Sequence, residues 1–220
     1  MLMFRWRWLA ATVLDCLAIA IGLWFARRIV PDCGLPVSAP MLEFELALDR
    51  SGLARVIDCL PRRNELDLQN LVDLSFFISA YPAFLAVFAW AAGVRLTIAI
   101  LLGAGIVLSD VTETVALRAI SAAWPLLETS FISVLAIGAR LKFVLIGVLM
   151  LLAAISLWRG GGALARLVAA TMVIGSIGSL VTMVPGVGRT GSTMIAVAWL
   201  AMFAHSAGQF LSRKPTRPAI

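Results

Sequence analysis

Charged and metal-binding residues are scarce in this sequence. Charged side chains make up 14% of its 220 residues, whereas soluble domains carry about 25%. His205 is the only histidine and the three cysteines do not cluster, so a zinc site has too few ligands and no Ser-His-Asp arrangement is evident. We therefore expect no metal and no cofactor, and interpret His205 as a histidine at a membrane interface. The net charge of +6 lacks a basic run with interleaved aromatic residues, which argues against nucleic-acid binding.

Apolar residues dominate the chain instead. They make up 61% of it, and they form repeated runs of about 18 or more residues, each long enough to span a bilayer. We predict an all-α, polytopic membrane helix bundle, with residues 1–220 forming one membrane domain of about five or six transmembrane helices. The predicted spans are 8–30, 71–92, 96–117, 141–158, 167–184 and 193–211.

Two stretches allow more than one interpretation. The N-terminus resembles a signal peptide, but Asp15 interrupts its apolar part and no small-residue cleavage site follows, so we expect an uncleaved helix. The segment 118–140 is apolar but is broken by Pro125 and Glu128. We expect it to be interfacial or re-entrant; the alternative is the first half of a long, tilted helix.

A polar insert at residues 31–70 separates the first two spans. Apolar and polar residues alternate at 42–49, a period of two that predicts a strand, although an amphipathic helical turn is the alternative. A short helix is then expected, with Ser51 as its N-cap and Pro61 as its end.

The cysteines and charges of the insert bear on orientation. Cys33 and Cys59 both lie in it; a disulfide on the oxidising side of the membrane is one interpretation, and two unrelated cysteines are the other. The insert is acidic, with seven acids against four arginines. We expect a cytoplasmic N-terminus, an external insert and a location in a bacterial inner membrane. Membrane lipids are the expected partners, with the 31–70 insert as the contact surface for a protein partner.

Two acids fall deep inside the third predicted span. Asp110 and Glu113 are three residues apart and therefore share a helix face. A carboxylate at such depth costs about 2.5 kcal/mol or more unless it is paired or protonated. We interpret the pair as a proton or cation site that faces the bundle interior; the alternative is a pair satisfied by neighbouring threonines or an arginine. The candidate partners are Asp15, Arg140 and Lys142.

Two further patterns are polar or small. Asp67, Asn70 and Asp73 form a stripe that leads into the second span; the first two suit a solvated face, and Asp73 is expected to cap or pair within the insert. The small residues of "GSIGS" at 175–179 favour the close approach of another helix.

The stretch "PGVGRTGST" at 185–193 carries a resemblance. It resembles the P-G-x-S-R-S-G-x-T motif of undecaprenyl-pyrophosphate phosphatases, except that Gly188 replaces the first serine. The resemblance implies a lipid-phosphate phosphatase-like enzyme that uses Arg189. It also resembles the end of the tyrosine-phosphatase signature, but Met183 stands where that chemistry needs a cysteine. The residues expected to bind an anion or a lipid headgroup are Gly186, Gly188, Arg189 and Thr190.

The order of motifs gives a broader resemblance and a functional expectation. One helix, the acidic "FELA", an Asp before an aromatic-rich helix, and D-x-x-E in the next helix are similar to uncharacterised small bacterial membrane proteins. We expect a non-enzymatic module for assembly, interaction or carriage of a small cargo. The alternatives are an ion- or proton-coupled transporter that uses Asp110 and Glu113, and the enzyme that uses Arg189.

Overall fold

The described part of the protein is entirely helical. The computed structural model describes residues 2–28, 45–47, 49–57, 72, 76–124, 129–184 and 187–212, and no strand occurs in these ranges. The helices are α1 (Leu2–Arg28), α3 (Arg50–Ile57), α5 (Ile78–Ala92), α6 (Leu96–Ala123), α7 (Thr129–Gly160), α8 (Ala163–Thr182) and α9 (Gly188–Leu211). Among these residues, α6, α7, α8 and α9 are long and apolar enough to cross a membrane, and α5 is a shorter apolar helix. The predicted all-α membrane bundle is confirmed.

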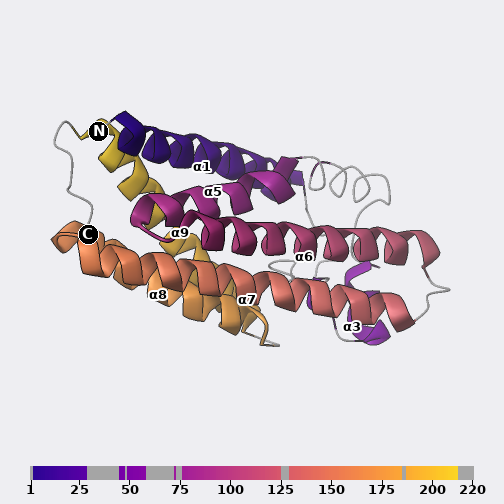
Figure 1. The fold of residues 1–220 in the computed structure, drawn as a ribbon. Coiled ribbons are helices and arrows are strands. Elements are labelled where there is room, and N and C mark those ends of the chain that lie inside the picture. The colour runs from indigo at the N-terminus through magenta and orange to yellow at the C-terminus, as the bar shows by residue number, and fades with distance from the viewer. Residues whose placement is uncertain are drawn as a thin grey trace.

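Six of the helices form a closed ring. The order around the ring follows the chain: α1 packs against α5, α5 against α6, α6 against α7, α7 against α8 and α8 against α9. The ring closes because α9 packs against α1, and α3 lies outside it. An additional contact joins α5 to α7 across the ring. Figure 1 shows the helices running nearly parallel or antiparallel, with the start of α1 and the end of α9 at the same end of the bundle. We call this end the terminal end and the opposite end the insert end.

Glycines make the turns and the tightest helix contacts. Gly93 has a φ of 113°, in the left-handed region that glycine tolerates, and ends α5 just before α6. At the crossing of α8 and α9, a Cβ on Gly191 would collide with the backbone of Thr182, so these helices approach to a distance that only glycine permits. A Cβ on Gly175 would likewise collide with the side chain of Ala198 on α9. The close packing expected from the small residues at 175–179 is therefore present.

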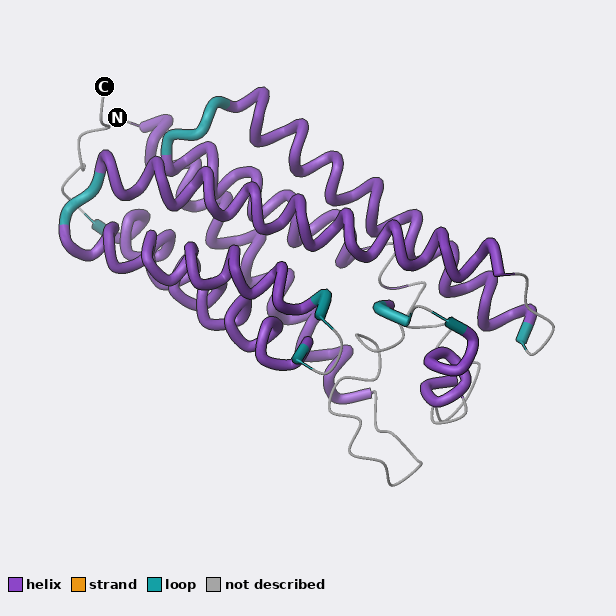
Figure 2. The backbone as a smooth tube through the Cα atoms, turned by 90° about the horizontal axis from the view of Figure 1, so that it is seen from below, coloured by secondary structure: helices purple, strands orange, loops and turns teal. Residues whose placement is uncertain are grey.

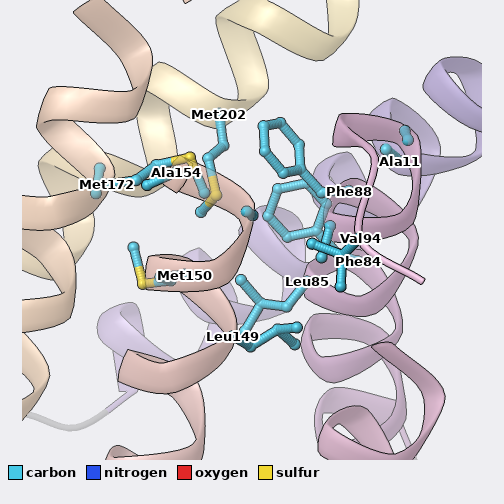
Figure 3. Close-up of a cluster of buried hydrophobic side chains, with 14 of the residues drawn as sticks. Ala11, Phe84, Leu85, Phe88, Val94, Leu149, Met150, Ala154, Met172 and Met202 are labelled. Carbon is cyan, nitrogen blue, oxygen red and sulfur yellow. The ribbon is translucent and has the colours of Figure 1, made fainter. Parts of the chain in front are cut away.

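The main hydrophobic core lies inside the ring. Aromatic rings from α5, chiefly Phe84 and Phe88, face methionines from three other helices (Figure 3). Met150, Met172 and Met202 are all fully buried; their unbranched side chains fill the irregular space between crossing helices. This core fixes α5 against α7, α8 and α9, and so fixes the side chains that α5 presents at the insert end.

A second, smaller core lies at the insert end. The helices α6 and α7 have 28 and 32 residues, or about 42 and 48 Å, which exceeds a hydrocarbon layer of about 30 Å. They project beyond their neighbours as a hairpin, and α3 lies beside the projecting part (Figures 1 and 2). Leu53 of α3 is buried there against Leu117, Ile120 and Leu135. The insert is thus packed onto the hairpin through its described residues.

This geometry bears on two expectations. The described residues of 118–140 belong to two long helices, because α6 continues to Ala123 and α7 begins at Thr129; residues 129–140 therefore form the first part of a long helix, which was the alternative for this segment. The strand predicted at 42–49 is wrong where the segment is described, since Glu45–Ala47 and Asp49 form no strand. The short helix that follows is present as α3. Its cap is Asp49, whose carboxylate accepts the Gly52 N–H at 2.8 Å, rather than Ser51.

Candidate functional site

Lys142 is the centre of a buried ionic cluster. Its ammonium lies 3.1 Å from Asp110 Oδ1, 2.8 Å from Glu113 Oε1 and 3.2 Å from Glu45 Oε2. An ammonium has three hydrogens to donate, and here each direction meets a different carboxylate. The three carboxylates come from α6 and the insert, and Lys142 itself lies on α7, so one side chain joins the two long helices to the segment outside the ring.

Tyr81 of α5 completes this cluster. Its hydroxyl donates to Asp110 Oδ2 at 2.7 Å, so the two oxygens of Asp110 are bound by two different helices. Tyr81 is itself buried, with its ring against Phe77 at a centroid distance of 4.9 Å. We refer to Glu45, Tyr81, Asp110, Glu113 and Lys142 as the Lys142 cluster.

A glycine lets the two long helices come close beside the cluster. Gly138 lies one turn before Lys142 on α7, and a Cβ there would stand 3.1 Å from both Glu113 N and Ser109 O. Few real Cβ atoms approach backbone so closely. The absence of a side chain at Gly138 therefore sets the short separation at which Lys142 reaches Glu113, whose Oε2 is also 2.7 Å from the ammonium.

The cluster contains more negative than positive charge. Three carboxylates surround one ammonium, which gives a formal charge of −2 when every group is ionised. The side chains of Asp110 and Glu113 are only 4% and 1% exposed. Unbalanced charge is costly in such a setting, and like charges in contact oppose each other's ionisation. The arrangement is therefore suited to bind one or two protons, or another small cation.

The position of the cluster along the helices places it toward the insert end. Asp110 is 14 residues from Leu96, the start of α6, and Lys142 is 18 residues from Gly160, the end of α7. These separations correspond to about 21 Å and 27 Å. For a hydrocarbon layer of about 30 Å that begins at the terminal end, the cluster lies near its far edge. Glu45 has the most exposed side chain of the ionic groups, at 19%, and connects the cluster to the insert side.

Of the three predicted partners of Asp110 and Glu113, the structure brings one to the cluster. Lys142 is the partner that the structure pairs with both acids. Arg140 is not, because its guanidinium donates to the Ala136 carbonyl of its own helix at 2.8 Å. The prediction that Asp15 joins this site is wrong: Asp15 is fully buried on α1 and accepts a hydrogen bond from the Trp199 indole of α9.

Sequence reasoning missed two members of the cluster. Glu45 was part of an acidic stretch without an assigned role, and Tyr81 had none either. The available signal for Tyr81 was that it is the only tyrosine of the chain, placed at a helix start rich in phenylalanine. Nothing local distinguishes Glu45 from the other acids of the insert, since its partner lies 97 positions away.

The glycine-rich stretch before α9 is not part of this cluster. Arg189 is exposed, and no described residue forms an ion pair with it. Gly188 starts α9, while the Thr190 amide donates to the Val187 carbonyl within the first turn. Headgroup binding by these residues stays a prediction. Asp73, Gly186, Cys33 and Cys59 lie outside the described residues.

His205 is buried between aromatic side chains. It is 5% exposed and lies with its ring edge-on to Trp8 at 5.2 Å and near Phe88 at 6.3 Å. Its position at a membrane interface stays a prediction. Within the described ranges, no group of three His, Cys, Asp or Glu side chains is arranged to hold a metal ion.

Comparison with known proteins leaves the site to be interpreted from its own geometry. No family model, curated protein or solved structure matches the chain.

Proposed function

We propose that this protein is a small proton-coupled membrane carrier and that the Lys142 cluster binds the coupling proton. The observation that supports this function is the charge imbalance of the cluster, in which one ammonium faces three carboxylates. A structural ion pair needs one acid for each base, so it does not account for the two additional carboxylates. Proton binding removes the excess charge, and buried acids in membrane helices commonly serve proton or ion movement.

The contacts of Lys142 suggest how a proton is coupled to movement. When Glu45 is ionised, its contact with Lys142 holds the insert against α7. Without this contact the ammonium is left with Asp110 and Glu113 alone. The charge state of the cluster thereby sets how firmly Glu45 is held at the outer side of the site. A ligand shifts such an equilibrium only through its different affinity for the two states.

The test measures charge movement after a pH step, which requires no knowledge of the cargo. The full chain is reconstituted in liposomes and adsorbed on a solid-supported membrane, and the transient current after a pH jump is recorded. We expect a current from the wild-type protein and a loss of that current in Asp110→Asn and Glu113→Gln. Asp49→Asn is the matched control, because it makes the same chemical change at an exposed acid outside the cluster while an asparagine still caps α3.

Two outcomes would contradict the proposal. One is an unchanged current in Asp110→Asn when size-exclusion chromatography and circular dichroism show a folded protein. The other is a wild-type current that follows a sodium jump at constant pH but not a pH jump, which would identify the bound cation as a metal ion.

We also propose a bacterial inner membrane location with the terminal end in the cytoplasm. Basic residues favour the cytoplasmic side of a membrane. Among the described residues, the terminal end has five arginines and no acid, whereas the insert end carries arginines together with acids of the insert, Glu45 and Asp49. These five are Arg5, Arg7, Arg95, Arg159 and Arg166. A green fluorescent protein fused to the C-terminus should fluoresce, and an alkaline phosphatase fused there should be inactive; the reverse pattern would invert the topology.

A further inference from the structure

Asp15 is a buried carboxylate that the Lys142 cluster does not use. It lies 13 residues from each end of α1 (Leu2–Arg28), is 0% exposed and forms no ion pair with any described residue. The Trp199 indole N–H donates to its Oδ1, while its Oδ2 is buried without a hydrogen-bond partner. The negative charge of an ionised carboxylate in the middle of a bundle is costly, and one indole hydrogen bond does not offset that cost. A proton on Oδ2 removes the charge.

His205 offers a second unpaired group on the same seam between α1 and α9. Its Nδ1 is buried and has no hydrogen-bond partner. His205 lies six residues before the end of α9 at Leu211, about 9 Å from the terminal end. Histidine is the side chain whose ordinary pKa lies closest to neutral pH, so it is chemically suited to exchange protons there.

Two hydroxyls add polar groups to the seam. Thr12 is one helical turn before Asp15 on α1, and Ser206 follows His205 on α9. Their hydroxyl oxygens lie 3.3 Å apart, and each hydroxyl also donates to a backbone carbonyl of its own helix. The contact between α1 and α9 is therefore polar between the level of Asp15 and the terminal end.

Aromatic rings separate this seam from the Lys142 cluster. Trp199, which donates to Asp15, packs its ring near Tyr81 at 6.1 Å and near Phe84 at 5.3 Å. On its other side, Tyr81 donates to Asp110. Asp15 is therefore bound by Trp199 and Asp110 by Tyr81, and the rings of Trp199 and Tyr81 are neighbours. Neither ring carries a group that ionises readily at neutral pH.

We infer that Asp15 is a second proton-binding site, loaded from the terminal end, where His205 lies on the same seam, and separated from the Lys142 cluster by the rings of Tyr81, Phe84 and Trp199. The inference rests on the proposed function for its role in transport, since it places one proton site on each side of an aromatic layer. The other titratable or charged groups on α1 and α9 and on the helices packed against them are Arg5, Arg7, Cys16, Arg27 and Arg28 on α1, Tyr81 on α5, Arg166 on α8 and Arg189 on α9. Arg5 contacts the Phe210 carbonyl and Arg7 stacks on Trp90, both at the terminal end.

The binding site is tested with dicyclohexylcarbodiimide, an apolar reagent that reacts with protonated carboxyl groups in apolar surroundings. The full chain in nanodiscs is treated over a range of pH, digested and mapped by mass spectrometry. We expect modification of Asp15 at neutral pH, a decline as the pH rises, and no modification of the exposed Asp49. An Asp15 that stays unmodified at every pH, or that reacts only as much as Asp49, would overturn the inference.

The role of His205 is tested separately with His205→Phe, which keeps an aromatic ring between Trp8 and Phe88. We expect this variant to lose the pH-jump current while Asp15 remains modified, because Asp15 still binds its proton at equilibrium. A wild-type current in His205→Phe would remove His205 from the proton route. Failure of the proposed function is distinguishable, since it would abolish the current of the wild-type protein and leave the modification of Asp15 intact.

Discussion

Replacement of Lys142 by methionine is expected to destabilise the protein strongly. Methionine has a similar length but no charge, so the formal charge of the cluster changes from −2 to −3. Asp110 and Glu113 stay buried without their cation. Removing one partner of a buried ion pair costs about 3–5 kcal/mol, and we expect Lys142→Met to lower the free energy of unfolding by about this amount.

The opposite substitution is expected to behave differently. Asp110→Asn changes the formal charge from −2 to −1 and keeps an oxygen for Tyr81 or Lys142. Its effect should therefore not exceed about 1 kcal/mol, the net contribution of one neutral hydrogen bond. The asymmetry between the two substitutions follows from the excess of carboxylates over ammonium groups in the cluster and from the three hydrogen bonds that only Lys142 donates.

Unfolding by sodium dodecyl sulfate in mixed micelles, followed by tryptophan fluorescence and circular dichroism, measures both free energies. A triple variant, Lys142→Met with Asp110→Asn and Glu113→Gln, should recover most of the lost stability because it has no unpaired buried charge. Equal losses for Lys142→Met and Asp110→Asn, or no recovery in the triple variant, would refute the charge-balance reasoning.

Three further predictions concern packing and capping, and the same unfolding assay checks them. Gly138→Ala should lower the free energy of unfolding by about 1–3 kcal/mol through overpacking, because the added Cβ would lie 3.1 Å from the backbone of α6. Gly208→Ala is the control, since a Cβ there would have no atom within 4 Å. A similar loss of stability in the control would contradict the packing argument. Gly191→Ala should cost at least as much as Gly138→Ala, because its Cβ would collide with the backbone of α8, and a neutral result would mean that α8 and α9 separate easily. Asp49→Ala should cost about 1 kcal/mol through loss of the α3 cap, whose carboxylate accepts the Gly52 N–H, whereas Asp49→Asn should remain near the wild-type value.

The sequence allowed much of the helical scaffold to be predicted, because apolar length is a local signal. The i, i+3 spacing of Asp110 and Glu113 also correctly placed both acids on one face that points inward. Lys142 was a candidate partner on the grounds that a carboxylate inside a membrane span is costly unless it is paired. These inferences used only neighbours in sequence and the cost of charge in an apolar environment.

The rest depended on contacts between distant segments. Pro125 and Glu128 made the segment 118–140 look interrupted, although α7 runs from Thr129 to Gly160 and its Lys142 is neutralised by acids from α6 and the insert. Glu45 and Tyr81 reach the cluster only because of the ring order of the helices, which no local pattern encodes. The role of Gly138 is likewise visible only once α6 lies against α7.

The seam between α1 and α9 has a consequence for the order of events during synthesis. Asp15 and its donor Trp199 are 184 positions apart, and at about 5–20 residues per second the ribosome needs roughly 10–40 s to reach the second after the first. Throughout that interval α1 has no α9 to pack against, and the carboxyl group of Asp15 has no indole donor. The ring of helices therefore closes only when the final segment is made, so a chain truncated before α9 would keep an open, polar face on its first helix.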